Sequence, residues 1–447
     1  MLKKLGVISL GCSKNLVDTE MMVGILRDAG YELTDELAEA QVIIINTCTF
    51  IDPAKDESIQ TILQAAEYKN TGACEKLVAA GCLTQQYKES LGKEIPEIDI
   101  FIGTDSWQHV LEAVEESYAN NGEKIYKFDT APCEHEELIP RQTLTPKYSA
   151  YVKIAEGCSN GCTFCYIPYV RGQMRSRPIP SIVHEVRRLT EEGVREFNLI
   201  AQDLSCYGRD LNNGTNLAKL LKELVKIKDL KWIRLFYLYP TYFDEELLNI
   251  IVSEDKICKY VDIPLQHISD SILQRMHRKD SSDSIKKLLR KLRNVTPRMT
   301  VRTTFMVGFP GETRADFDEL LDFIKEVRFD NVGAFTYSPQ DGTPAARMQD
   351  QIDDQIKEDR YHELMSVQAK ISEENDRNLI GTETEVLVEE LVNDGAGHIQ
   401  AKGRASFQAP EVDGNVYVEN PNGVHVGDFI RVRISDGYAY DLIAEQI

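Results

Sequence analysis

The chain has 447 residues, of which 42% are hydrophobic and 28% are charged, a composition typical of a soluble globular protein with roughly three domains. It contains no run of about 18 apolar residues, and its N-terminus becomes polar too soon for a signal peptide, so a membrane span and secretion are not expected. We therefore expect a cytoplasmic protein, in which the ten cysteines serve as metal ligands or catalytic groups more readily than as disulfides.

The formal net charge of −21 is unevenly distributed along the chain. Residues 1–140 carry 11 basic against 25 acidic side chains, residues 141–377 carry 36 against 35, and residues 378–447 carry 4 against 12. Acidic ends repel polyanions and attract basic partners, although such charge also serves solubility alone. Charge by itself leaves both interpretations open.

Short apolar runs alternate with helical patterns in the first 126 residues. Helices are predicted at about 16–29 and 53–68, and buried strands at Leu5–Leu10, Val42–Ile45, Leu77–Ala80 and Ile98–Ile102. This alternation indicates a small α/β domain with a parallel sheet. Residues 127–147, with three prolines and an acidic patch, are predicted to form a linker.

Residues 148–378 repeat a strand–helix unit about six times and end in a helix predicted at about Gln355–Leu379. The predicted strands are Tyr151–Glu156, Phe197–Gln202, Lys231–Leu238, Tyr260–Leu265, Thr300–Val307 and Asn331–Tyr337. Six successive units indicate a partial (βα)6 barrel, whose open side admits a large substrate and whose working face is formed by the carboxyl ends of the strands.

Residues 379–447 change in character, because short alternating segments and turn glycines replace the helical patterns. Strands are predicted at 384–390, 398–401, 415–418 and 429–433. Strands at this spacing indicate a small antiparallel β-barrel, so the whole chain is predicted to be an α/β multidomain protein.

The strongest chemical signal is the C-x3-C-x2-C motif of Cys158, Cys162 and Cys165, directly after the first barrel strand. Three closely spaced thiolates suit three irons of a [4Fe–4S] cluster and leave the fourth iron open. An open iron can bind S-adenosylmethionine, and electron transfer then releases a 5′-deoxyadenosyl radical. A structural zinc site is the alternative, but it needs four ligands and no further Cys or His follows nearby. The motif resembles that of the radical S-adenosylmethionine superfamily.

A second set of cysteines follows the first three strands of the N-terminal domain. Cys12, Cys48 and Cys82 each come directly after a predicted parallel strand, and such strand ends share one edge of the sheet. Gly11 and Gly81 precede two of them and allow close approach of the backbone. We expect the three thiols to converge on a second [4Fe–4S] cluster with an open iron; small buried core residues are the alternative.

The remaining cysteines have no partner pattern and are expected to be structural: Cys74, Cys133, Cys206 and Cys258. Arg175 and Arg177 follow the cysteine loop and are candidates to hold the cofactor carboxylate or a substrate aspartate, with structural ion pairs as an equal alternative.

Further candidates lie at the ends of barrel strands. Gln202 and Asp203 end the second strand, where this superfamily often contacts the amino group of the cofactor, although its Gly-Gly-Glu form is absent here. Gln266 and His267 end the fourth strand and are candidates for contact with cofactor or substrate, with a structural role as the alternative for His267. The glycines of residues 308–312 are expected to form a turn first, with contact to the ribose or adenine as a second possibility.

The three parts together resemble the methylthiotransferase family, with a TRAM domain at the end. Residues 11–20 and 262–269 look like the RimO branch, which acts on an aspartate of small-subunit ribosomal protein S-twelve. The MiaB-like branch, which modifies tRNA, typically has Gln-Met-Asn after the first cysteine, where this chain has Ser13-Lys14-Asn15. The excess of acidic residues in the TRAM-like part also suits a basic protein better than a nucleic acid.

The resemblance implies two clusters and two S-adenosylmethionine molecules. One molecule donates methyl to a sulfide held at the open iron of the N-terminal cluster, and the second is cleaved at the other cluster. The radical takes hydrogen from the β-carbon of the aspartate, which then captures the methylthio group. Both clusters must therefore face one cavity, with the edge of the N-terminal sheet over the carboxyl face of the barrel. An electron donor such as a flavodoxin is implied.

Two other functions stay open at this point. A tRNA adenosine 2-methylthiotransferase would have the same two clusters but a basic groove. A non-catalytic iron–sulfur factor that binds the ribosome would produce no deoxyadenosine from S-adenosylmethionine and a reductant.

Overall fold

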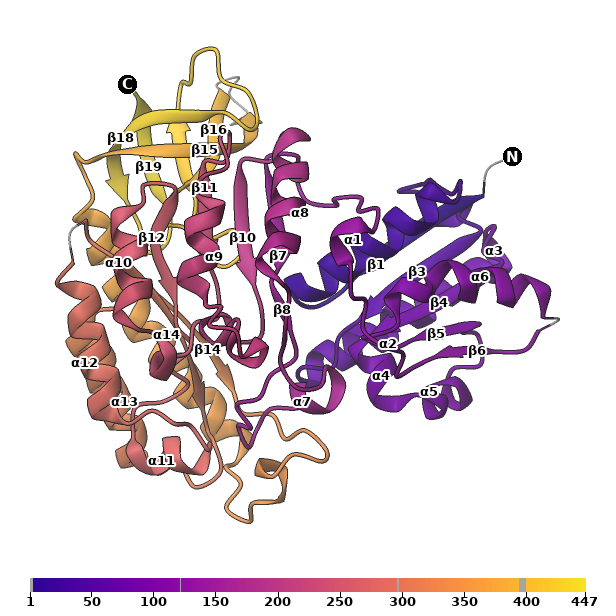
Figure 1. The fold of residues 1–447 in the computed structure, drawn as a ribbon. Coiled ribbons are helices and arrows are strands. Elements are labelled where there is room, and N and C mark those ends of the chain that lie inside the picture. Colours follow the sequence, from indigo (N-terminus) through magenta and orange to yellow (C-terminus); the bar gives the residue numbers. More distant parts are fainter. Residues whose placement is uncertain (1–2, 121, 296, 394–398) are drawn as a thin grey trace.

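The computed structural model describes residues 3–120, 122–295, 297–393 and 399–447. Figure 1 shows an N-terminal α/β part beside a central curved sheet covered by helices, and a small β-barrel at one end of that sheet. The predicted fold class is confirmed. Within the described residues, no helix combines the length and the apolar character needed to cross a membrane.

The N-terminal part is a parallel sheet with the strand order β2-β1-β3-β4-β5-β6. Its strands are β1 (Lys4–Ser9), β2 (Glu32–Leu33), β3 (Val42–Thr47), β4 (Lys76–Gly81), β5 (Ile100–Ile102) and β6 (Ile125–Lys127). Its helices are α1 (Ser13–Asp28), α2 (Asp52–Ala66), α3 (Tyr68–Thr71), α4 (Cys82–Tyr87), α5 (Glu89–Glu94) and α6 (Val110–Ala119). Helices α1 and α6 pack on one face, and α2, α4 and α5 pack on the other. The short edge strands β2 and β6 were not predicted.

The central sheet has six parallel strands in the order β14-β13-β12-β11-β10-β7 and is open, as predicted for a partial barrel. Its strands are β7 (Ser149–Lys153), β10 (Glu196–Ile200), β11 (Trp232–Leu235), β12 (Ile257–Asp262), β13 (Thr300–Val307) and β14 (Asn331–Thr336). The first predicted strand is split, because β8 (Ala155–Glu156) turns away and pairs with β9 (Arg175–Ser176).

Helices cover the outer face of this sheet and form the largest apolar core with it. They are α8 (Ile179–Glu191), α9 (Leu217–Leu224), α10 (Glu245–Ser253), α11 (Asp270–Arg275), α12 (Ser282–Arg293), α13 (Arg314–Val327) and α14 (Asp354–Arg377). The short helix α7 (Ile167–Val170) lies instead at the junction, against α4 of the N-terminal part. Helix α10 lies between β11 and β12, where the predicted strand–helix repeat places a helix. It begins at the Asp244 side chain, which accepts a hydrogen bond from the Leu247 amide.

The C-terminal part is a closed barrel of five strands. They are β15 (Glu383–Asn393), β16 (Ile399–Ala405), β17 (Val416–Glu419), β18 (Phe429–Gly437) and β19 (Leu442–Gln446). All neighbouring strands are antiparallel except β17 and β19, which are parallel. The strand predicted from His398 starts at Ile399, and residue 398 itself lies outside the described residues. Strand β19 was not predicted.

Buried charges fasten the small barrel to the amino ends of the central strands. Arg404 of β16 donates hydrogen bonds to both carboxylate oxygens of Glu196 at the start of β10, at 2.8 and 3.1 Å. In the loop that follows β16, the Ser406 carbonyl accepts from Arg234, and Asp413 accepts from the Tyr260 hydroxyl at 2.7 Å. Cys158, Cys162 and Cys165 lie at the opposite, carboxyl ends of the central strands.

The segment predicted as a linker is packed rather than loose. Arg141 has a fully buried side chain that pairs with Glu20 of α1 and, at 2.6 Å, with Glu185 of α8. It also donates to the Tyr151 carbonyl of β7 at 2.7 Å. This segment therefore holds the N-terminal part against the central one.

Candidate functional site

The structure places the three N-terminal cysteines at one edge of the sheet, as predicted. Cys12 precedes α1, Cys48 follows β3, and Cys82 begins α4 after β4. Gly11 has φ +84°, and a side chain there would place its Cβ 2.8 Å from the Cys48 sulfur; Gly81 has φ +92°. Both positions therefore require glycine. The thiols lie near enough to one another for charge on Cys12 to influence the other two.

Asn15 connects the three loops that carry these cysteines. Its side-chain amide donates to the carbonyls of Leu10 and Thr47 at 3.0 and 2.9 Å, just before Cys12 and Cys48. Its side-chain oxygen lies 3.7 Å from the sulfur of Cys82. The Asn15 side chain is fully buried, so these bonds are sheltered from water.

The second set of cysteines lies in the loop between β8 and α7. The Cys158 amide donates to the Gly172 carbonyl at 3.1 Å, and the Cys165 amide donates to the Cys162 carbonyl at 3.1 Å. Burial raises the pKa of Cys165 to about 12, as it does that of Cys82. Because thiolates are the ligands of iron, metal binding at either set must displace protons.

Arg171 joins the two sets of cysteines. Its side chain donates to the side-chain oxygen of Asn15, which lies 3.7 Å from the Cys82 sulfur, while the carbonyl of the next residue, Gly172, accepts from the Cys158 amide. The guanidinium is fully buried and pairs with Asp18 of α1 at 3.1 Å and with Glu156 of β8 at 2.9 Å. The two cysteine sets therefore meet at one junction, with Arg171 between them.

Lys153, at the end of β7, completes this buried network. Its ammonium lies 2.6 Å from Asp18 and 2.9 Å from Glu156. Burial opposes ionisation of Glu156, but Arg171 and Lys153 hold its pKa far below the usual range. The network fixes α1 of the N-terminal part against the first barrel strand.

Other contacts place the edge of the N-terminal sheet at the carboxyl face of the central part. Phe50, after β3, packs against Phe335 of β14 with ring centroids 6.2 Å apart. Asp52 accepts a hydrogen bond from Ser338, just after β14, at 2.9 Å. Thr104, after β5, hydrogen-bonds the Val170 carbonyl of α7. The edge of the N-terminal sheet thus lies against the carboxyl face of the central part.

Gln202 and Asp203 lie beside the second cysteine set. The Gln202 amide donates to Glu156 at 2.8 Å, and its side-chain oxygen is buried without a partner among the described residues. Asp203 accepts from Asn160 at 2.7 Å and caps the turn that begins at Leu204. Cys206 hydrogen-bonds Asp203 and lies near Cys158, so it belongs to this neighbourhood.

Gln266 and His267 lie between the ends of β12 and β13. Gln266 has φ +70°, and its side-chain oxygen is buried without a partner among the described residues. His267 is fully buried, and its Nδ1 accepts from the Ser269 amide at 3.0 Å. Burial lowers the pKa of His267 to about 4 and keeps the ring neutral. This setting favours the structural role of His267.

The turn expected at residues 308–312 is present, since Gly308 and Gly311 have positive φ.

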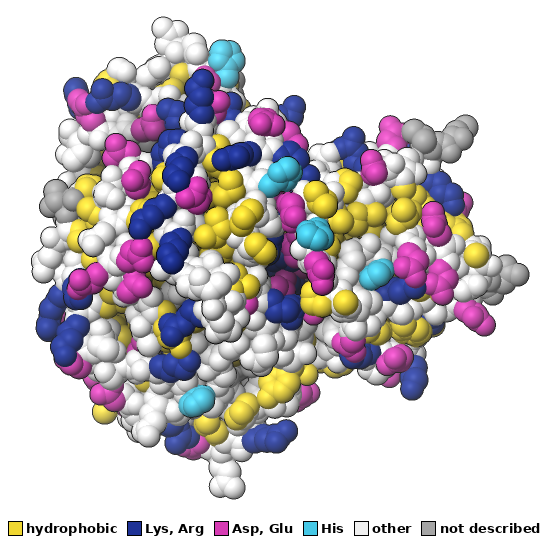
Figure 2. Space-filling model, in the orientation of Figure 1, with side chains coloured by type: hydrophobic (Ala, Val, Ile, Leu, Met, Phe, Trp, Pro, Cys, Tyr) yellow, Lys and Arg dark blue, Asp and Glu magenta, His cyan; other side chains and the backbone are white. Residues whose placement is uncertain are grey.

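Arg175 and Arg177 are engaged in ion pairs. Arg175 lies 2.6 Å from Asp105 of the N-terminal part, and Arg177 lies 2.6 Å from Glu185 of α8. Both line a cavity of about 220 Å³ with Lys153 and Glu156. Figure 2 shows a hollow at the junction of the two parts, bordered by acidic and basic side chains. These contacts favour the structural alternative for both arginines.

Several residues of the site were not assigned a role from the sequence: Lys14, Arg171 and Arg278. Burial raises the pKa of Cys162 and the nearby charge of Arg278 opposes that rise; Arg278 also lies 3.9 Å from the centre of the Tyr239 ring. Burial lowers the pKa of Lys14 to about 8. Arg171 follows the mostly apolar residues Ile167–Val170, and a charged residue next to an apolar run was the available signal.

The donor sets suit clusters better than a single ion. Among the described residues, no group of three His, Cys, Asp or Glu is arranged to hold one metal ion. All ten cysteines are free thiols. A four-iron cluster binds each thiolate through a different iron, so its ligands stand further apart than those of one ion. The free thiols of the two triads are therefore of the kind that an iron–sulfur cluster requires.

Comparison with known proteins agrees with the geometry. Three family models match: "Uncharacterized protein family UPF0004" over residues 4–103, the radical SAM superfamily over 152–324 and the TRAM domain over 380–447. The ribosomal protein uS12 methylthiotransferase RimO of Geotalea uraniireducens is 47% identical over 443 residues, 99% of this chain and 98% of that protein. This chain belongs to the RimO family. RimO of Geobacter sulfurreducens is 46% identical, and that of Desulforamulus reducens is 45% identical over 99% of both chains.

Solved structures share the fold of this chain. The radical S-adenosylmethionine methyltransferase TsrM of Kitasatospora setae has a TM-score of 0.55 at 14% identity, with 77% of each chain covered. The cobalamin-dependent enzyme OxsB has a TM-score of 0.54 at 14% identity and covers 83% of this chain and 56% of its own. Membership of the RimO family and of the radical SAM superfamily implies a [4Fe–4S] cluster and S-adenosylmethionine.

Proposed function

We propose that this chain, a radical S-adenosylmethionine methylthiotransferase of ribosomal protein uS12, acts at the β-carbon of an aspartate and uses two [4Fe–4S] clusters. Cys12, Cys48 and Cys82 hold one cluster, and Cys158, Cys162 and Cys165 hold the other. When bound, the clusters and S-adenosylmethionine supply the methylthio group and the radical that removes hydrogen from an unactivated carbon.

The observation that carries this proposal is the position of Arg171 between the two triads. Its side chain donates to Asn15, which lies against Cys82, and the next peptide carbonyl accepts from the Cys158 amide. A reaction that takes a hydrogen at one cluster and adds sulfur from the other needs both within reach of a single substrate carbon. The buried ion pairs of Lys153 with Asp18 and Glu156 hold the two parts together at this place.

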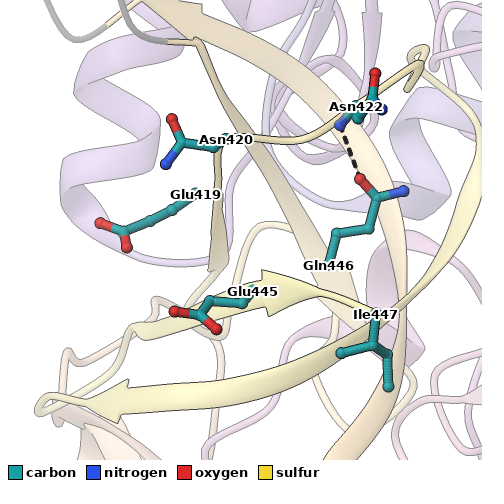
Figure 3. Close-up of a pocket in the computed structure, with 6 residues that line it drawn as sticks. All are labelled: Glu419, Asn420, Asn422, Glu445, Gln446 and Ile447. Carbon is teal, nitrogen blue, oxygen red and sulfur yellow. Dashed lines mark hydrogen bonds between the residues drawn. The ribbon is translucent and has the colours of Figure 1, made fainter.

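The acidic surface of the C-terminal barrel supports a basic protein substrate. A depression of about 490 Å³ is lined by Glu419, Asn420, Asn422, Glu445, Gln446 and Ile447 (Figure 3). Glu419 and Glu445 are directly opposite each other on the parallel strands β17 and β19, and among the described residues no lysine or arginine lines the depression. Like charges in register repel each other, and a cationic side chain relieves that repulsion.

The test is anaerobic turnover of the reconstituted protein with S-adenosylmethionine and dithionite, which replaces the physiological donor, a small redox protein such as a flavodoxin. Ribosomal protein uS12 and unmethylthiolated tRNA are offered in parallel and analysed by mass spectrometry. The expected result is one methylthio group in place of one hydrogen on an aspartate peptide of uS12. The same gain on tRNA alone would overturn the substrate assignment.

A further inference from the structure

Lys14 is a buried ammonium beside the N-terminal cysteines that has no counter-ion of its own. Only 7% of the surface of Lys14 is exposed to solvent. The ammonium lies 3.4 Å from the centre of the Tyr237 ring. Among the described residues, no side chain or carbonyl forms a hydrogen bond or an ion pair within 4.0 Å with this ammonium. The charged residues around it, such as Glu156 and Asp262, act on it from a longer distance. A ring face attracts a cation but does not neutralise it.

The carboxylates nearest to Lys14 are already neutralised by other cations. Glu156 lies 2.9 Å from both Lys153 and Arg171. Asp262, at the end of β12, lies 3.0 Å from Arg302. The carboxylates of the junction are thus balanced without Lys14, and the strongest charge that acts on Lys14 is that of Cys12, two residues earlier. Because the proposed function uses Cys12 as an iron ligand, a carboxylate brought by the substrate is the further anion that this buried cation can bind.

The place of Lys14 is where a substrate must enter. Cys12, two residues earlier, is the exposed member of its triad, whereas Cys48 and Cys82 are buried. Tyr237 lies two residues after the end of β11, at the carboxyl face of the central part, and its ring faces the Lys14 ammonium. Lys14 therefore lies between the open side of the N-terminal triad and the ends of the barrel strands.

We propose that Lys14 binds the side-chain carboxylate of the substrate aspartate and is the residue that selects an acidic side chain. The carboxylate carbon is bonded directly to the β-carbon. An ion pair at Lys14 therefore places the reacting β-carbon beside Cys12. This inference rests on the proposed function, because it names the group of the uS12 substrate that the site recognises.

The experiment measures peptide binding and does not depend on turnover. Two fluorescent peptides are used: the uS12 segment with the modified aspartate, and the same segment with asparagine in its place. Binding to the reconstituted holoenzyme is followed by anisotropy without S-adenosylmethionine. The variants are Lys14→Met, which keeps the length of the side chain but removes the charge, and Lys14→Arg, which keeps the charge.

A matched control exists at the opposite end of the same domain. Lys3 also lies over a tyrosine ring, with its ammonium 3.1 Å from the centre of the Tyr118 ring. It precedes β1, whereas the cysteines follow the strands, so Lys3→Met removes a lysine–tyrosine contact without touching the junction. This variant is expected to bind both peptides as the unaltered protein does.

The unaltered protein is expected to prefer the aspartate peptide by about tenfold or more, as a charged hydrogen bond provides. Lys14→Met is expected to bind the aspartate peptide as weakly as the asparagine peptide, with the latter changed less than about twofold. Lys14→Arg is expected to keep the preference. The iron content per chain, measured on each variant, is expected to stay unchanged.

Equal losses for both peptides in Lys14→Met, or no loss, would overturn the inference. Equal losses together with a shifted reduction potential of the N-terminal cluster would assign Lys14 to the cluster instead. If Lys14→Met does not retain iron, Lys14→Arg decides: loss of the aspartate preference in that variant would overturn the proposal. Failure of this inference and failure of the proposed function give different results. If the unaltered protein modifies tRNA and binds neither peptide, the proposed function itself fails. If the unaltered protein modifies uS12 and replacement of Lys14 has no effect, only this inference fails.

Discussion

The side-chain oxygen of Asn15 lies 3.7 Å from the sulfur of Cys82, although the two residues belong to different strand–helix connections of the sheet. The amide of the same side chain binds the loops that lead to Cys12 and Cys48. The side chain of this one buried asparagine thus contacts all three loops that carry the cysteines. We therefore expect Asn15 to help fix the relative positions of Cys12, Cys48 and Cys82.

Replacement of Asn15 by alanine is expected to loosen the N-terminal triad. Each carbonyl left without its donor costs about 1–3 kcal/mol, which the loops avoid by moving apart. The iron content of the purified protein should fall from about eight toward about four per chain. Asn198→Ala is the control, because Asn198 is equally buried but bonds Ser149 in the barrel. Full iron in Asn15→Ala would contradict this role.

The ion pair between Asp18 and Lys153 is expected to stabilise the junction of the two parts. In Asp18→Asn, Lys153 and Arg171 keep only Glu156 as a shared anion. The free energy of unfolding is expected to fall by about 3–5 kcal/mol, because all these groups are buried. The midpoint of thermal unfolding should fall accordingly. The double variant Asp18→Asn with Lys153→Met should recover part of the loss. An unchanged midpoint for the single variant would show that the pair contributes nothing.

The C-terminal barrel is expected to detach when Arg404 is replaced by methionine. Although burial opposes ionisation of Glu196, Arg404 and Arg234 hold its pKa at about 2, so the carboxylate stays charged and needs both arginines. Limited proteolysis between α14 and β15 should become faster by at least about tenfold. Arg433→Met is the control, since Arg433 forms an exposed pair with Glu383 that is worth about 0–1 kcal/mol. Equal cleavage of both variants would contradict the prediction.

Asp376 is expected to make stability depend on pH. Burial, with Asp330, Asp441 and Asp413 nearby, raises its pKa to about 7, against a smaller opposing effect of Arg298. The folded state therefore binds a proton that the unfolded state releases, so this stabilisation is complete below about pH 4 and is lost as pH rises through about 7. Asp376→Asn should unfold at a higher temperature than the unaltered protein at pH 8, and with no such advantage at pH 4. A gain of equal size at both pH values would refute it.

The sequence was sufficient to predict the parts of the site that depend on chain order. Parallel strands place their carboxyl ends at one edge, so the convergence of Cys12, Cys48 and Cys82 followed from their positions after strands. Gly11 and Gly81 have the positive φ that the prediction of close approach implied. The same logic located Cys158, Cys162 and Cys165 after the first central strand.

Contacts between distant segments could not be predicted in this way. Arg141 lies in a proline-rich segment that resembles a linker, and only the folded structure brings Glu20 and Glu185 to it. Periodicity likewise gives no information on which anion an arginine meets, so Arg175 and Arg177 were left between cofactor, substrate and ion pair. The edge strands β2 and β6 are two or three residues long, too short for an alternating pattern to register.

The iron content of three proteins tests most directly the claim that both triads hold clusters. They are the unaltered chain, a variant with alanine at Cys12, Cys48 and Cys82, and a variant with alanine at Cys158, Cys162 and Cys165. After anaerobic reconstitution we expect about eight irons per unaltered chain and about four in each variant. About four irons in the unaltered chain, lost entirely when Cys158, Cys162 and Cys165 are replaced, would contradict the account.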